Sequence, residues 1–228
     1  WFSLRVKNSM NNFADNAEAK QWLEETTNVI LAELSAPDVA FPSHIHEYYL
    51  SLCSVGTACM FVGEPTTREG ISFRSIHIDE IFIAENADGI VDTVFRIFKM
   101  TVRQIVQKWG EKSLSPRIQR MYEKKEFDKE VELFHCVYPR DDVDKGKKAA
   151  TMLPVASVYI DEKEKHVLAE GGFDEMPYMV GRWSKIVGEV FGRSPAMTAL
   201  PDIKMLQEIM KTTIKAAQKV VDPPLLVP

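Results

Sequence analysis

Cysteine is scarce in this chain, and the three that occur fit neither of the usual cysteine frameworks. They are Cys53, Cys59 and Cys136. An odd number cannot close a complete set of disulfides, and the five residues between Cys53 and Cys59 do not give the CxxC spacing of a zinc knuckle. We therefore predict three reduced thiols that are buried as small apolar side chains.

The chain also lacks the short motifs of common catalytic sites. It has no GxxxxGK[ST] phosphate loop, no GxSxG elbow, no HExxH pair and no Rossmann fingerprint. His44 and His46 form the one close histidine pair, but on a predicted helix two residues this far apart point to different faces. Gly171-Gly172 is too short for a phosphate cradle and predicts a turn. The sequence therefore predicts no ATP motor, no cofactor and no metal site.

Long hydrophobic runs are absent as well. No segment reaches the roughly 18 to 20 apolar residues of a membrane-spanning helix, and the first residues lack the basic and apolar regions of a signal peptide. The chain begins at Trp1 without an initiator Met and stops at Pro228 without a polar tail. We therefore expect the core of a longer protein, intracellular in origin and with no membrane partner.

Positive charge is not in excess. The 28 Lys and Arg residues face 33 Asp and Glu residues, for a formal net charge of -5. A dedicated nucleic-acid binder draws its affinity from many phosphate contacts by Lys and Arg, so the composition disfavours that class. Transient contact with nucleic acid stays open. The 45% hydrophobic content is that of a soluble globular protein with a substantial core.

Helix signals occur along the whole chain. A first helix is expected from a cap at Asp15 to about Leu34, and a second after Ser43. Thr101 with a glutamine three residues later forms a capping box, and Ser115-Pro116 has the cap and the first-turn proline of a further short helix.

Strand signals lie between the helices, which predicts an α+β fold. Strands are expected over residues 57–62, 71–78, 80–84, 91–98, 131–138, 155–160 and 166–168. Those within 71–98 are expected to form one antiparallel sheet. The charged run 161–165 is expected at a hairpin tip, and the charged run 140–148 in a solvated loop.

A long C-terminal helix carries the clearest periodicity. Six residues recur at alternating steps of three and four, a spacing that suits packing against another helix: Ile203, Leu206, Met210, Thr213, Ala217 and Val220. We call these residues the seam. Thr213 and Ala217 are weak coiled-coil residues, and Met205 and Ile209 widen the apolar stripe. Packing of the helix on its own domain therefore explains the pattern nearly as well.

Two further groups of residues suggest function. Lys211, Lys215 and Lys219 follow one another at i+4 steps and form a basic stripe opposite much of the apolar stripe, where a solvated surface is the simplest explanation. His77 and Asp79 would share one face of a strand, with Glu80 and Glu85 nearby, so an acid-base or metal-dependent enzyme using residues 77–85 is an alternative. A monomeric binding module is a second alternative.

Four groups of short sequence motifs are similar to motifs of a known family. They are GEVFGRSP (188–195) with ALPDIK (199–204) and DPP (222–224); FRSIH (73–77) with EIFIAE (80–85); VFR (94–96) with Thr101 and WG (109–110); and HCVYPR (135–140) with GGF (171–173). In these motifs and in their order, the chain resembles the head-to-tail connector, or portal, proteins of short-tailed bacteriophages. Phe191 stands where Tyr is commoner in the family, which keeps an aromatic side chain.

The resemblance implies a portal-like α+β fold in three parts. These are a wing-like helix and antiparallel sheet region (1–128), a small clip-like β region (129–187) and a stem-like helix with a Pro-rich exit (188–228). It also implies a ring, dodecameric in the family, that is assembled in the host cytoplasm and set at one capsid vertex of the virion. Double-stranded DNA would be packaged through this ring by the terminase and later ejected.

Expected partners also follow from the resemblance. They are further copies of the chain, the terminase large subunit, capsid and scaffold proteins, tail adaptor proteins, and double-stranded DNA in transit. In such a ring the three lysines would line the DNA channel and the seam would pack subunits together. The chain is expected not to be an enzyme, because the terminase would supply the energy.

Overall fold

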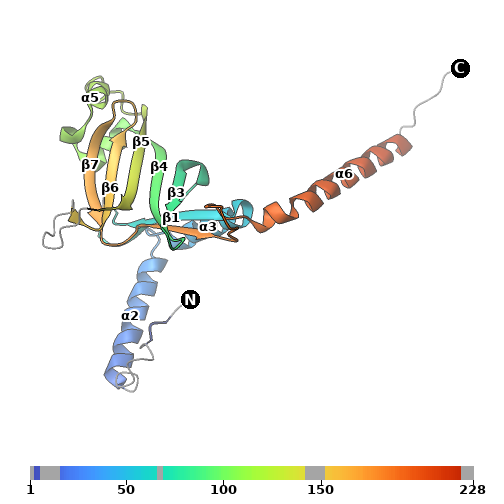
Figure 1. The fold of residues 1–228 in the computed structure, drawn as a ribbon, viewed down its shortest axis with the longest axis horizontal. Helices are drawn as coiled ribbons and strands as arrows, with labels where there is room; N and C mark the ends of the chain where they lie inside the picture. Colours follow the sequence, from blue (N-terminus) through green and yellow to red (C-terminus); the bar gives the residue numbers. More distant parts are fainter. Residues whose placement is uncertain (1–2, 6–15, 66–68, 142–151, 222–228) are drawn as a thin grey trace.

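The computed structural model describes residues 3–5, 16–65, 69–141 and 152–221. Its helices and antiparallel sheets confirm the predicted α+β class. Figure 1 shows a body of strands and short helices from which two helices project in different directions. They are α2 (Ala17–Ser35) and α6 (Pro195–Val221). The loop predicted over 140–148 lies mostly outside the described residues.

The larger sheet of the body has five antiparallel strands in the order β3-β4-β5-β6-β7. Their bounds are Ile81–Glu85 for β3, Val91–Thr101 for β4, Glu130–Pro139 for β5, Val155–Asp161 for β6 and His166–Phe173 for β7. The β6–β7 hairpin confirms the predicted turn at the charged run. The turn predicted at Gly171-Gly172 was wrong, because both glycines pair with β6 inside β7.

The smaller sheet has three antiparallel strands in the order β2-β1-β8. They are β2 (Ser72–Ile76), β1 (Thr57–Gly63) and β8 (Tyr178–Arg182), of which β8 was not predicted. The single sheet predicted within residues 71–98 was therefore wrong. A short 3-10 helix, η1 (Ile78–Glu80), separates β2 from β3, so the chain leaves one sheet and enters the other instead of forming a hairpin.

Helix α2 begins one residue later than predicted, at a cap formed by Asn16, whose side chain accepts a hydrogen bond from the Glu18 N–H at 2.9 Å. Asp15, the predicted cap, lies outside the described residues. Thr27 is the one buried residue of α2, and Trp22 and Val29 are exposed. The single chain thus leaves part of the apolar surface of this helix exposed.

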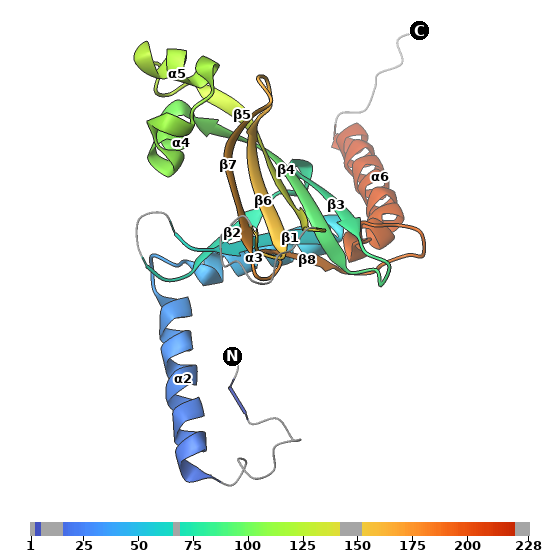
Figure 2. The same cartoon turned by 60° about the vertical axis from the view of Figure 1, so that its left-hand side comes forward.

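Two short helices close one end of the larger sheet (Figure 2). Helix α4 (Val102–Trp109) has the predicted capping box, and α5 (Pro116–Glu123) has the predicted serine cap. Both signals are confirmed because they act within one helical turn. A further short 3-10 helix, η2 (Glu111–Ser113), joins them. The core beneath consists of eight buried residues: Phe98, Val102, Ile105, Leu114, Ile118, Val131, Leu133 and Leu168.

A second core lies between the two sheets. It contains Cys59, Ile76, Ile81, Val94, Val137 and Tyr178. All three cysteines are free, but the prediction of three buried thiols was wrong for Cys53, which is exposed on α3 (Phe41–Val55), and Cys136 is only partly buried. Burial raises the pKa of the Cys59 thiol to about 12, so this group stays protonated.

Strand pairing crosses the sequence position at which the wing-like and clip-like regions were divided. Strand β4 pairs with β5 in the larger sheet, and β1 pairs with β8 in the smaller sheet. In the single chain, residues 1–128 and 129–187 therefore share both sheets. The division into wing-like, clip-like and stem-like parts stays a prediction about the assembled protein.

Candidate assembly helix and its anchoring site

Helix α6 leaves the body of the molecule as a free rod (Figures 1 and 2). The structure describes this helix in full, and none of its residues is buried. The alternative that the seam packs on its own domain is therefore not what the single chain shows. Among the described elements, α3 makes the most extensive contact with α6.

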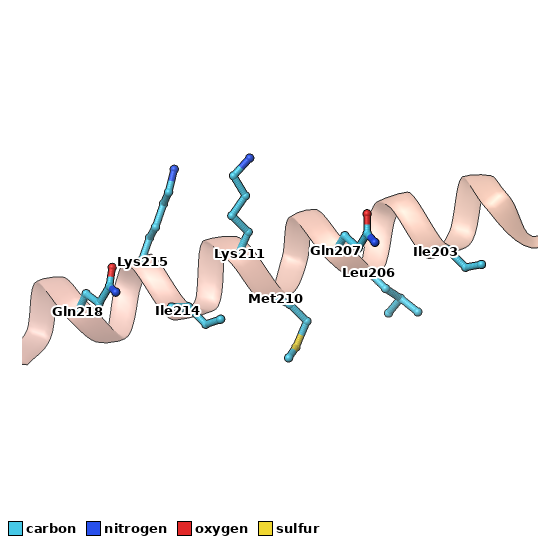
Figure 3. A pocket seen from close by; sticks show the side chains of 8 residues that line it. All are labelled: Ile203, Leu206, Gln207, Met210, Lys211, Ile214, Lys215 and Gln218. Atoms are coloured by element: carbon cyan, nitrogen blue, oxygen red, sulfur yellow. The ribbon is translucent and has the colours of Figure 1, made fainter. Parts of the chain in front are cut away.

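The apolar and basic side chains of α6 point in opposite directions. Figure 3 shows Leu206, Met210 and Ile214 on one side of the helix and Lys211 and Lys215 on the other. Leu206 and Met210 are 58% and 61% exposed in the single chain. The remaining predicted seam residues, which are Ile203, Thr213, Ala217 and Val220, are exposed too. Contact between the seam and a second helix stays a prediction.

The lysine stripe is only partly neutralised by the helix itself. The Lys211 ammonium lies 3.1 Å from a Glu208 carboxylate oxygen, an exposed i,i+3 pair. Exposed pairs of this kind contribute about 0–1 kcal/mol. Within the described part of the chain, Lys215 and Lys219 have no ion-pair partner. The stripe is thus available to an external anion, and its assignment to a DNA channel stays a prediction.

The segment GEVFGRSP anchors the start of α6 to the end of α3. The Ser194 hydroxyl donates a hydrogen bond to the Ser54 carbonyl at 2.7 Å and accepts one from the Met197 N–H at 2.9 Å. The same hydroxyl therefore caps α6 and ties it to α3. Ser194 is almost completely buried, which protects both bonds from water.

Two glycines allow the backbones to meet at this anchor. The Gly192 N–H donates to the Thr57 hydroxyl at 2.8 Å. A Cβ atom on Gly192 would lie 2.3 Å from the Gly56 carbonyl oxygen, and one on Gly56 would lie 2.4 Å from the Arg193 carbonyl carbon. Gly56 also has a φ of 81°, the left-handed conformation that ends α3. Close approach therefore explains glycine at both positions.

A partly buried charge cluster holds the segment before the anchor. Glu85 at the end of β3 accepts hydrogen bonds from the Arg182 guanidinium and from the Lys185 ammonium, the latter at 2.6 Å to each carboxylate oxygen. Arg182 also donates to the Val190 carbonyl at 3.2 Å and to the Gly89 carbonyl at 3.0 Å. The cluster thus links the β3–β4 hairpin to the chain leading into α6. Sequence analysis missed it because the groups are far apart in the chain.

The residues proposed for the enzyme alternative do not gather into one site. His77 and Asp79 form a pair at 3.3 Å, but their side chains are 64% and 85% exposed. The other two carboxylates are paired with cations. Glu80 pairs with Arg96 at 2.7 Å, and Glu85 belongs to the charge cluster with Arg182 and Lys185. Across the described residues there is no group of three or more His, Cys, Asp or Glu side chains placed to hold a metal ion.

The histidine pair of α3 is also divided. The His44 Nδ1 atom accepts a hydrogen bond from the Ser75 N–H at 3.5 Å, which ties α3 to β2, while His46 is exposed.

None of the helices in the described part of the chain has the length and apolar character needed to cross a membrane.

Comparison with known proteins places the chain in a family. The family model described as "Bacteriophage head to tail connecting protein" matches residues 1–228. The chain is 31% identical over 235 residues to the portal protein of Salmonella phage epsilon15, covering 100% of this chain and 41% of that protein. It is 29% identical over 230 residues to the probable portal protein of Bordetella phage BPP-1, covering 100% of this chain and 40% of that protein.

The chain thus spans about two fifths of the length of the curated relatives it matches. The match nevertheless includes every element described above, from α2 to α6. The match confirms the resemblance that was inferred from GEVFGRSP and the other motifs. This chain belongs to the bacteriophage head-to-tail connecting protein family.

Proposed function

We propose that the chain is part of a portal protein that forms a ring at one vertex of a phage capsid. The observation that carries the proposal is α6, a helix of 27 residues with no buried residue and an apolar stripe along one side. Large exposed apolar surfaces mark interaction sites. Since the family match covers the whole chain, we assign this surface to a neighbouring copy. Head-to-tail contacts that close on themselves make a ring, here a dodecamer as expected for the family.

The ring would act through its shape and its docking partners. Double-stranded DNA would pass inward while the terminase large subunit is docked and outward through the tail at infection. Capsid and scaffold proteins would surround the ring in the virion, and tail adaptor proteins would bind it after packaging. The chain would not be an enzyme, because the terminase would supply the energy for DNA movement. Ring assembly would take place in the host cytoplasm.

Ring formation is the direct test of this proposal. We expect mass photometry of the full-length protein to show large closed oligomers at micromolar concentration, and electron images to show rings. A full-length protein that stays monomeric over that range would contradict the proposal. The 228-residue chain alone is a weaker test, because it spans only 41% of the length of a relative.

The lysine stripe gives a second test. Changing Lys211, Lys215 and Lys219 together to Gln keeps side-chain length and helix propensity and removes three positive charges per copy. Since α6 is exposed throughout, we expect the free energy of unfolding to change by less than about 0.5 kcal/mol. Rings should still assemble, while the amount of DNA packaged or retained, measured by quantifying encapsidated DNA, should change.

A matched control removes equal charge elsewhere. Lys112, Lys124 and Lys163 are exposed and lie outside α6. Changing these three to Gln should leave packaging at the wild-type level. If the Lys211, Lys215 and Lys219 variant packages as much DNA as this control, the assignment of the stripe to the channel is wrong. Neither variant should hydrolyse ATP without the terminase.

A further inference from the structure

An open groove of about 1150 Å³ runs between the two sheets, away from the anchor of α6. Its residues come from both sheets, from α4 and from the loops beside them. Aromatic side chains form much of its wall, namely Phe61, Phe98, Tyr159, Phe173 and Tyr178. No residue of α6 lines it. The groove therefore needs an explanation separate from the assembly helix.

Four cationic side chains line this groove: Lys99, whose ammonium lies 3.8 Å from a Glu130 carboxylate oxygen, and three others that come from three different elements. Arg74 comes from β2, Arg96 from β4 and Lys108 from α4. The Lys108 ammonium lies over the rings of Tyr159 and Trp109, at 4.4 Å and 4.8 Å from their centroids. The Arg96 guanidinium lies 4.4 Å from the centroid of the Phe98 ring. Cations held over aromatic rings keep their charge at the groove surface.

Two of the three last-named charges have no counter-ion among the residues that the structure describes. Arg96 is paired with Glu80, but no carboxylate among the described residues lies within ion-pair distance of Arg74 or Lys108. Desolvation, followed by repulsion from Arg74 and Arg96, lowers the pKa of Lys108 to about 8. An external anion near this ammonium would favour its charged form and so oppose both the desolvation and the repulsion. The two acidic residues of the groove wall, Glu64 and Asp174, leave both cations unpaired.

The groove lining also includes a buried polar side chain that is uncharged. His135 is almost fully buried, with Nδ1 at 2.6 Å from the Tyr178 hydroxyl and Nε2 at 2.9 Å from the Ser157 hydroxyl. Its ring stacks on Tyr159 at 3.9 Å between centroids. Burial, with Lys108 and Arg96 nearby, lowers the pKa of His135 to about 3, so this side chain is neutral near pH 7. Neutral hydroxyls and an imidazole do not repel an anion.

We propose that this groove binds a small phosphate-bearing ligand, with the phosphate held by Arg74, Arg96 and Lys108. A phosphate monoester carries nearly two negative charges at pH 7 and acceptor oxygens in several directions, which suits cations that approach from three elements. A carboxylate presents one charge in one plane and satisfies fewer of them. The aromatic wall provides room and apolar contact for the remainder of the ligand.

Inorganic phosphate is the probe for this site, with acetate as the carboxylate comparison. We expect titration calorimetry of the full-length protein at pH 7 and low salt to show saturable binding of one phosphate per chain. Acetate should bind at least about tenfold more weakly, since it loses the charge-assisted hydrogen bonds of a second cation. Arg74→Gln and Lys108→Gln should each weaken phosphate binding by about tenfold or more.

Lys112→Gln is the matched control. Lys112 is exposed on η2 and does not line the groove, so its substitution should leave phosphate affinity unchanged. Thermal melts of all variants without phosphate check that each one folds. Absence of saturable phosphate binding, equal affinity for acetate, or full affinity in an Arg74→Gln, Lys108→Gln double variant would each overturn the proposal. Ring assembly, measured in the same samples, tests the portal function separately.

Discussion

Replacing Leu206 and Met210 together with Asp should prevent ring assembly while the single chain still folds. In the single chain both side chains are more than half exposed, so the new carboxylates stay hydrated there. If the seam packs against a neighbouring helix, assembly would bury two unpaired charges per copy, at a cost of several kcal/mol. Repeated around a ring, that cost exceeds what a helix contact supplies. Mass photometry should then detect only monomers or small oligomers.

The control for this double variant places the same charges next to the seam residues of the same helix instead of on them. Gln207→Asp with Gln218→Asp adds two carboxylates to α6 outside the seam, with the same change in helix propensity. Rings of this variant should form as in the wild type. Normal assembly of the Leu206 and Met210 variant would show that the seam is not the subunit contact. A large drop in the melting temperature of its monomer would show that these side chains are buried in the single chain.

Changing Gly192 to Ala should destabilise the anchor of α6 by about 1–3 kcal/mol, the usual cost of forcing an extra carbon into a filled space. The new Cβ atom would meet the Gly56 carbonyl oxygen at 2.3 Å and the Arg182 Cβ atom at 2.9 Å. Backbone atoms cannot move aside as a flexible side chain does. We therefore expect weakening of the bond from Gly192 to Thr57, a lower free energy of unfolding in urea, and impaired ring assembly.

Gly171→Ala is the matched control, because no atom lies within 4 Å of the Cβ atom that it would add. Gly171 lies in β7, in the larger sheet, and its substitution should leave the urea midpoint and ring assembly close to those of the wild type. Equal stability of the two variants would show that the anchor tolerates a side chain at Gly192. Hydrogen exchange at the Gly192 amide offers a local measure, since its bond to Thr57 is buried.

Local signals in the sequence predicted much of the secondary structure. The capping box at Thr101 and the serine cap at Ser115 act within one turn, so neighbouring residues are sufficient to define them. The same holds for the hairpin between β6 and β7. The pairing of β1 with β8 is different, because it joins Cys59 to Val180 across about half of the chain. No local pattern specifies such a partner, so neither β8 nor the smaller sheet was predicted.

By itself, the sequence determined the family and the two faces of the last helix. Shared motifs such as GEVFGRSP identify the family. The 3.5-residue period places Leu206 and Met210 on one side of the helix, whatever that side contacts. Only the tertiary structure decided which surfaces remain uncovered. It leaves the apolar side of α6 exposed among the described residues, and it brings Arg74, Arg96 and Lys108 into one groove. Burial and charge convergence depend on contacts between distant segments, and those contacts exist only once both sheets have formed.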